Sequence, residues 1–294
     1  MNHLPRCKGT LRKKSVYVLQ LTLLVLPLAA RAQQLPIPSN TCELSTPGRC
    51  VAAVGKDEIG ILTSPRHIQK KDLKWILPLV AATGTAFAFD RQALGLIGTN
   101  PSQVNAFRTA SNFTGIYAPV AGLGAAWLTG TLTHNDHLRE TGLLAGEALA
   151  DTAIFTEMLK YATNRERPGS TGLQLESAEF WPERTSYPAG DSFPSGHTAI
   201  AFAFAHVVAD EYPSWEVKLA AYGLAAATAA ERLGGREHFP SDVLVGGAAG
   251  YLIGGYVYNH HAAAAKNRIM ISPIVGGGGI GGSVVFSFAH SNAQ

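Results

Sequence analysis

The sequence of 294 residues predicts an all-α fold, a helical bundle of about six helices with a short C-terminal β-hairpin-like tail. From residue 73 onward, apolar stretches of helical length alternate with short polar breaks, and strand-like alternation is nearly absent until the end. Hydrophobic residues make up 46% of the chain and charged residues only 15%, so it is more apolar than most soluble proteins. Together these observations favour closely packed helices.

Residues 1–32 predict a signal peptide for export. A basic start is followed by an apolar run over 16–28 and by the small-x-small pattern Ala30-Arg31-Ala32. An uncleaved membrane anchor is the alternative. Six of the 24 cations lie before Gln33, which leaves 18 against 21 acids in the rest of the chain. That charge balance argues against a nucleic-acid partner. From the signal peptide we expect the protein in the periplasm or cell envelope, and membrane integration is left open.

Residues 33–70 are polar and show no sustained periodicity, so we expect an extended leader or cap. Cys42 and Cys50 lie in this segment, and Cys7 would leave with the signal peptide. An even pair of cysteines in an oxidising compartment favours a small-loop disulfide, with two free thiols as the alternative. Two such ligands do not support a metal site.

Residues 71–262 form the expected helical domain. Six helices are predicted, over 75–89, 116–132, 140–161, 198–208, 217–230 and 242–258. A transmembrane helix needs about 20 consecutive apolar residues, and most of these runs are shorter. The run over 109–133 is long enough and free of Lys, Arg, Asp and Glu, and the run over 242–258 is borderline. We therefore expect a bundle that contacts the membrane.

Two segments outside the helices complete the organisation. The polar and aromatic loop over 169–192 is long for a compact domain, and loops of that length are usually functional, so we expect a lid or substrate lip. Residues 263–294 contain two β-prone runs around a Gly-rich stretch and predict the hairpin-like tail. Two strands alone are marginal, so the tail should pack on something or pair with a partner.

Three short blocks carry the chemistry, and the first runs from Lys160 to Pro168. Lys160 and Arg167 are seven residues apart, a spacing that returns to nearly the same face of a helix, and Pro168 would end that helix. Cations at a helix C-terminus can simply complement its dipole. Lys and Arg are also natural phosphate ligands, one as a point charge and the other as a planar fork.

The second block is Phe193-Pro194-Ser195-Gly196-His197, directly before an apolar run. Pro194 suits the first position of a helix, whose unsatisfied backbone N–H groups would form an anion site. Gly196 permits a close approach, and the Ser195 hydroxyl can add a hydrogen bond. His197 can protonate a leaving-group oxygen as a general acid, although a capping or packed histidine is the alternative.

The third block, from Arg232 to Asp242, repeats the Phe-Pro-Ser helix start with His238 just before it. Asp242 falls in the first turn, where an acid can complement the helix dipole. Its carboxylate could instead hold one ring nitrogen of His238 and leave the other free to attack phosphorus. Arg232 adds a third cation. The three blocks suit the cleavage of a phosphate monoester.

These blocks resemble the superfamily that joins type-2 phosphatidic-acid phosphatases, bacterial class A acid phosphatases and vanadium haloperoxidases, over residues 143–258. The resemblance implies a helical bundle and a phosphohistidine mechanism without a metal ion or other cofactor. It implies the following roles: His238 as nucleophile, Asp242 as its orienting partner, His197 as acid and then base, and Lys160, Arg167, Ser195, Gly196 and Arg232 as phosphate ligands.

One position departs from the family pattern. The residue before Arg232 is usually Ser, and here it is Glu231, which we expect to point outward or to pair with Arg236. The expected function is an exported phosphatase for lipid phosphates or pyrophosphates. The alternatives are a soluble periplasmic acid phosphatase for small phosphate esters, a vanadate-dependent haloperoxidase, and a non-catalytic envelope protein.

Overall fold

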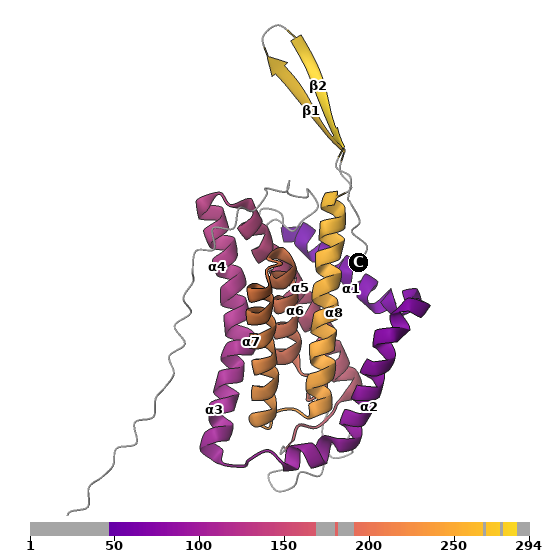
Figure 1. The fold of residues 1–294 in the computed structure, drawn as a ribbon, viewed down its shortest axis with the longest axis vertical. Helices are drawn as coiled ribbons and strands as arrows, with labels where there is room; N and C mark the ends of the chain where they lie inside the picture. The colour runs from indigo at the N-terminus through magenta and orange to yellow at the C-terminus, as the bar shows by residue number, and fades with distance from the viewer. Residues whose placement is uncertain (1–46, 169–179, 182–190, 267–268, 277–278, 287–294) are drawn as a thin grey trace, which may run out of the picture. The chain divides into compact units, whose positions relative to one another are not determined.

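The computed structural model describes residues 47–168, 180–181, 191–266, 269–276 and 279–286, with side chains from 48 to 260. Its helices are α1 (Pro47–Thr63), α2 (Leu73–Gly95), α3 (Pro101–Asn112), α4 (Ala118–Thr133), α5 (Asp136–Thr163), α6 (Gly196–Glu211), α7 (Trp215–Gly234) and α8 (Pro240–Lys266). Helix α6 packs against α5, α7 and α8 and is the centre of the bundle (Figure 1). The predicted all-α class is confirmed for the helical domain.

A ridge of small residues joins α6 to α8. Glycines recur every fourth residue on α8, and a Cβ added to Gly246, Gly250 or Gly254 would lie only 2.5, 1.9 or 2.7 Å from a backbone carbonyl oxygen of α6 or of its N-cap residue. Those oxygens belong to residues 195, 199 and 203, which share the same spacing. The absent side chains let the two backbones approach closely. The contact brings the first turns of α6 and α8 together, where two of the three blocks lie.

Helix α1 corrects the prediction of an extended leader within 33–70. Its most buried positions are Asp57, Glu58 and Ile61, with Val54 half-buried, which is the spacing of one helical face. Two of those positions carry acids, so a search for apolar periodicity misses the helix. Cys50 lies in α1 and is disulfide-bonded, whereas Cys42 lies outside the described residues.

Helix α3 is also absent from the predicted set. It begins with Asn100 as its N-cap, whose side chain accepts hydrogen bonds from the backbone N–H groups of Ser102 and Gln103, and Pro101 is its first residue. That Asn-Pro start was the available signal, since Pro at the first helical position is favoured. A π-helical turn, Phe113–Tyr117, then links α3 to α4.

Three further predictions concern the periphery of the chain. Among the described residues, no helix combines the length and the apolar character that crossing a membrane requires. Strands β1 (Ile269–Gly276) and β2 (Gly279–Phe286) follow α8, but their side chains are not described, so the hairpin-like tail stays a prediction. The signal peptide and nearly all of the 169–192 loop lie outside the described residues.

Candidate active site

Helix α5 ends before the first block does. Asn164 caps it in the left-handed conformation (φ 41°), so Arg167 lies beyond the helix, and the prediction that it shares a helical face with Lys160 is wrong. The Lys160 ammonium instead reaches the start of α6, where its Nζ lies 3.4 Å from the position of a Cβ on Gly196. It also forms an ion pair of 2.5 Å with Glu157.

Two carboxylates bind the arginines of the first and third blocks. Asp191 accepts hydrogen bonds of 2.6 and 2.7 Å from the Arg167 guanidinium. Glu237 forms ion pairs with Arg167 and, at 3.4 Å, with Arg232. Its other oxygen pairs at 2.7 Å with Arg108 of α3, a cation that the sequence analysis did not single out. The guanidinium groups therefore lie together around carboxylates, an arrangement that suits an anionic ligand.

The start of α6 differs slightly from the prediction. Ser195 is the N-cap and Gly196 the first helical residue, so Pro194 lies just before the helix instead of in its first position. The Ser195 hydroxyl pairs with that of Thr198 at 2.9 Å. Within the described part of the chain, the backbone N–H groups of Gly196 and His197 have no acceptor. They are available to an anion, as the first amides of a helix generally are.

His197 lies among the cations of all three blocks. Burial lowers the pKa of His197 to about 3, and the positive charges of Arg232, Arg167 and Lys160 act in the same direction. Its Nε2 lies 2.9 Å from the Asn112 side-chain oxygen. Burial and these cations therefore disfavour the protonated form of His197 in the free protein.

His238 is almost completely buried, with 1% of its surface exposed. Its Nδ1 lies 2.7 Å from the Ser192 carbonyl oxygen and 3.7 Å from Asp242 Oδ2. The carbonyl can only accept, so Nδ1 carries the proton and Nε2 keeps a free lone pair. Burial lowers the pKa of His238, against the opposing effect of Asp242, and keeps the ring neutral.

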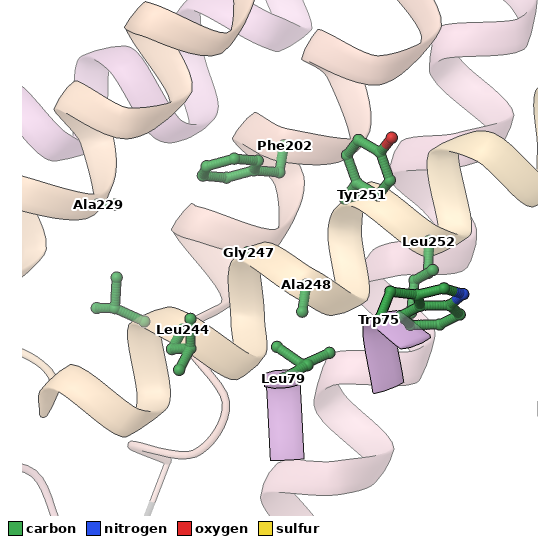
Figure 2. A pocket seen from close by; sticks show the side chains of 10 residues that line it. Trp75, Leu79, Phe202, Ala229, Leu244, Gly247, Ala248, Tyr251 and Leu252 are labelled. Atoms are coloured by element: carbon green, nitrogen blue, oxygen red, sulfur yellow. The ribbon is translucent and has the colours of Figure 1, made fainter. Parts of the chain in front are cut away.

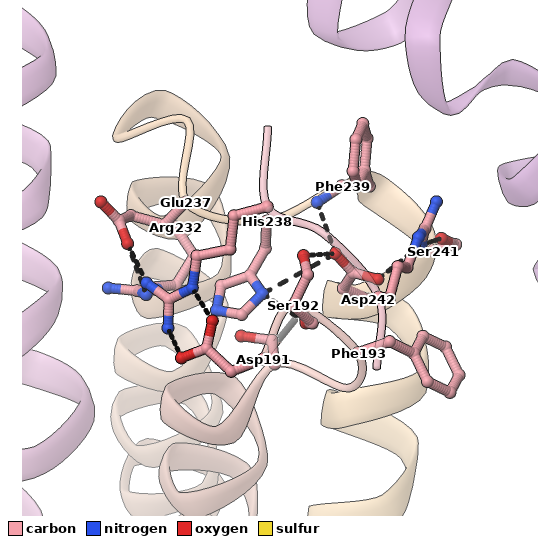
Figure 3. Close-up of polar contacts among 12 residues, drawn as sticks. Asp191, Ser192, Phe193, Arg232, Glu237, His238, Phe239, Ser241 and Asp242 are labelled. Atoms are coloured by element: carbon pink, nitrogen blue, oxygen red, sulfur yellow. Dashed lines mark hydrogen bonds and ion pairs between the residues drawn. The ribbon is translucent and has the colours of Figure 1, made fainter. Parts of the chain in front are cut away.

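The orienting contact therefore differs from the predicted one. The Ser192 carbonyl, and not the Asp242 carboxylate, accepts the short hydrogen bond from His238. Asp242 acts one step further out, because its Oδ2 accepts from the Ser192 hydroxyl at 2.6 Å and from the Phe239 N–H at 2.8 Å. Figure 3 shows Ser192 lying between His238 and Asp242.

A buried ion cluster lies behind Asp242. Arg165 donates to Asp242 at 2.5 Å and to Asp90 of α2 at 2.7 Å, and both carboxylates are almost fully buried. Asp90 also accepts from the backbone and the hydroxyl of Ser241 at 2.9 and 2.5 Å. The sequence analysis did not identify Arg165 or Asp90. Arg165 lies inside the first block, but its spacing from Lys160 and Arg167 does not indicate that its side chain is buried. Asp90 does not belong to any of the three blocks.

Of the two alternatives predicted for Glu231, pointing outward or pairing with Arg236, the pairing is wrong. The Glu231 carboxylate accepts a hydrogen bond of 2.6 Å from the Thr114 hydroxyl, while Arg236 donates to the carbonyl oxygens of Leu94 and Ile97. The departure from the family pattern is therefore accommodated by the π-helical turn between α3 and α4. Among the described residues, no group of three or more His, Cys, Asp or Glu side chains is placed to hold a metal ion.

Residues 141–266 match the family model described as the PAP2 superfamily. The chain is similar to lipid A 1-phosphatase of Porphyromonas gingivalis, with 28% identity over 253 residues that cover 83% of this chain and 50% of that protein. It thus spans about half the length of the curated relative it matches.

Two solved structures are also similar. LpxE of Aquifex aeolicus matches with 21% identity and a TM-score of 0.39, over 54% of this chain and 87% of that one. The transmembrane PAP2 type phosphatidylglycerolphosphate phosphatase of Bacillus subtilis matches with 19% identity and a TM-score of 0.42, over 73% and 96%.

Proposed function

Because residues 141–266 match the family model of the PAP2 superfamily, we propose that this chain is an exported phosphatase that hydrolyses lipid phosphates or lipid pyrophosphates without a metal ion. The observation that carries the proposal is the state of His238. Burial lowers the pKa of its ring and so favours the neutral form, and the Ser192 carbonyl accepts the Nδ1–H, which leaves Nε2 as the proposed nucleophile. A neutral imidazole beside cations suits attack on a bound phosphate.

The substrate phosphate replaces carboxylates at the arginines. Asp191 and Glu237 occupy Arg167 in the free protein, and a phosphate with its greater charge and three oxygens competes for the same donors. The first amides of α6 and the Lys160 ammonium complete the binding of its oxygens. This anion then lies next to His197.

The reaction proceeds in two steps. The lone pair of His238 Nε2 forms a bond to phosphorus while the bond from phosphorus to the alcohol oxygen breaks, and His197 gives its proton to that oxygen. Water then attacks the phosphohistidine, His197 accepts the proton of the water, and the N–P bond breaks to release inorganic phosphate. The first step needs a protonated His197. Burial and the neighbouring cations lower the pKa of His197 to about 3 in the free protein. The negative charge of the bound substrate opposes the effect of those cations and favours the protonated ring.

An apolar cavity of 770 Å³ supports the choice of a lipid substrate. It lies between α2, α6, α7 and α8, is lined by residues that include Trp75, Leu79, Phe202 and Tyr251, and starts at Val243, one residue after Asp242 (Figure 2). Its lining extends along α8 to Leu252, roughly 13 Å of helix. We assign this cavity to an acyl chain of the substrate, at the face of a membrane in the cell envelope.

The test is phosphate release by the purified protein from a lipid phosphate in detergent micelles and from a soluble aryl phosphate, each with and without a chelator. We expect a preference for the lipid, no effect of the chelator, and loss of release in His238→Ala. His260→Ala, which removes an exposed histidine at the other end of α8, is the matched control and should retain full activity.

Each other outcome has a defined meaning. Equal turnover of the two substrates would replace the lipid phosphatase with a broad-specificity acid phosphatase. Loss of activity in the chelator would contradict the metal-independent mechanism. Release that persists in a correctly folded His238→Ala variant would exclude His238 as the nucleophile.

A further inference from the structure

The buried ion cluster behind Asp242 connects a helix outside the family match to the proposed nucleophile. Asp90 lies near the C-terminal end of α2, whereas the match to the PAP2 superfamily starts at residue 141. Asp90, Arg165 and Asp242 each expose 1% of their surface or less. Burial of three charged groups at one place is costly, so their geometry has to be well defined.

Each charged group in the cluster has at least one partner of opposite charge. Arg165 uses Nη2 for Asp90 and Nη1 for Asp242 and the Ser241 hydroxyl, at 2.5 to 2.7 Å. Both carboxylates accept only N–H and O–H groups, as ionised carboxylates do. Two carboxylates and one guanidinium leave a net charge of −1 on the side of His238 that carries Nδ1–H.

Aromatic rings fix the guanidinium in place. The Arg165 carbon Cζ lies 4.4, 4.9 and 5.2 Å from the ring centroids of Phe239, Phe180 and Phe87. Phe87 and Asp90 are one helical turn apart on α2, so the same turn supplies a ring and a carboxylate. The guanidinium therefore has little freedom to turn away from Asp242.

We propose that Asp90 and Arg165 are positioning residues for His238, which act through Asp242 and Ser192. Asp90 fixes Arg165, Arg165 fixes Asp242 Oδ1, and Asp242 Oδ2 fixes the Ser192 hydroxyl next to the carbonyl that accepts from His238. Asp90 also neutralises the positive charge of the Arg165 guanidinium. The negative charge of Asp242 can then stabilise the His238 ring when the phosphohistidine forms. Helix α2 is therefore part of the catalytic apparatus, although it touches no reacting atom.

The test is a double-mutant cycle of Asp90→Asn, Asp242→Asn and the double variant in the full chain, with aryl phosphate as the substrate. Asp90→Asn should lower kcat about 10- to 100-fold, as loss of a group that orients a functional side chain typically does, with KM nearly unchanged. In the Asp242→Asn background the same substitution should have almost no further effect, because residues in one network are not additive. Asp136→Asn, which breaks an exposed ion pair with Arg139, is the control and should leave kcat unchanged.

The kinetic test requires that the protein is a phosphatase, so it depends on the proposed function. A spectroscopic measurement tests the positioning role independently of that activity. The ¹⁵N chemical shifts of His238 report which ring nitrogen carries the proton, even in a protein that hydrolyses nothing. We expect the Nδ1–H tautomer in the unsubstituted chain and a mixture of tautomers in Asp90→Asn. If no substrate is hydrolysed but the tautomer changes, the phosphatase proposal fails and the positioning proposal stands.

Other results would overturn the positioning role. Multiplicative losses of kcat in the double variant, or an unchanged tautomer, would show that Asp90 does not act through Asp242. A lower melting temperature with normal kcat would leave Asp90 a structural role only. If Asp90→Asn does not fold, Asp90→Glu replaces it, because this variant keeps the negative charge but moves the carboxylate. A kcat of Asp90→Glu equal to that of the unsubstituted chain would contradict the proposal.

Discussion

The tripeptide Phe-Pro-Ser occurs at the start of both α6 and α8, yet the backbone N–H groups at the two helix starts have different partners. At α6 the helix begins after Ser195, and the next two backbone N–H groups have no acceptor within the described residues. At α8 the helix begins at Pro240, and the N–H of Ser241 donates to the Asp90 carboxylate. One start is open to an anion from outside, and the other already binds an anion of the protein.

This difference shows that a helix N-terminus is a binding site only when the fold leaves it empty. Both starts have the positive end of a helix dipole, and the first amides of each have no acceptor within their own helix. What separates them is a carboxylate from α2, 151 residues away in sequence from Ser241. The open start, at α6, can therefore bind the substrate phosphate. The filled start, at α8, contains the groups proposed to position His238.

The largest effect expected at the open start comes from His197→Asn, because this residue is the proposed acid. With a poor leaving group, kcat should fall about 10²- to 10⁴-fold, the usual contribution of general acid catalysis. With an aryl phosphate the loss should be much smaller, since that leaving group needs no proton. Steady-state kinetics on both esters measure this, with His260→Asn as the control. Equal losses on both esters would assign His197 to binding and not to proton transfer.

The two serines of the repeated tripeptide offer a direct comparison of the starts. Ser241→Ala removes hydrogen bonds to Arg165 and Asp90 in a buried charged cluster, and should lower the free energy of unfolding by about 1–3 kcal/mol. Ser195→Ala removes one bond to Thr198, and should cost about 1 kcal/mol while raising KM. Urea denaturation and kinetics of both variants test this. Equal losses of stability would remove the distinction between an open and a filled start.

The smallest effect is a pH dependence at the open start. The pKa of His197 is about 3 in the folded chain and 6.5 as its ordinary value, so between these pH values the unfolded chain binds more protons. Stability from this residue is therefore lost as the pH falls below 6.5. Relative to His197→Asn, the unsubstituted chain should lose about 1 kcal/mol between pH 7 and pH 5, after allowance for solvent screening. Urea denaturation at both pH values measures the difference, and a constant difference would contradict the assigned pKa.

The sequence predicts these elements unequally, for physical reasons. The six helices with continuous apolar faces are predicted, because periodicity records burial directly. Helix α1 is not, since acids occupy its buried face at Asp57 and Glu58. Among the candidate site residues, His197, His238 and Asp242 stand in local motifs and can be named from the sequence.

The residues that contact these site residues could not be predicted from the sequence. Asp90, Arg108 and Asn112 reach the site from α2 and α3, and only the packing of those helices brings them there. The hydrogen bond from His238 to the Ser192 carbonyl uses a backbone atom, which no residue type encodes. Motifs in the sequence can name the groups that do chemistry, but not the groups that hold them in position.

The glycine ridge between α6 and α8 has a consequence for how this protein can change. Because Gly246, Gly250 and Gly254 each fit one carbonyl of α6, the two helices have a single register. A slip by one helical turn would displace His238 by about 5.4 Å from the start of α6. We therefore expect the two helices to behave as one rigid unit, in which an insertion or deletion would move His238 away from the start of α6.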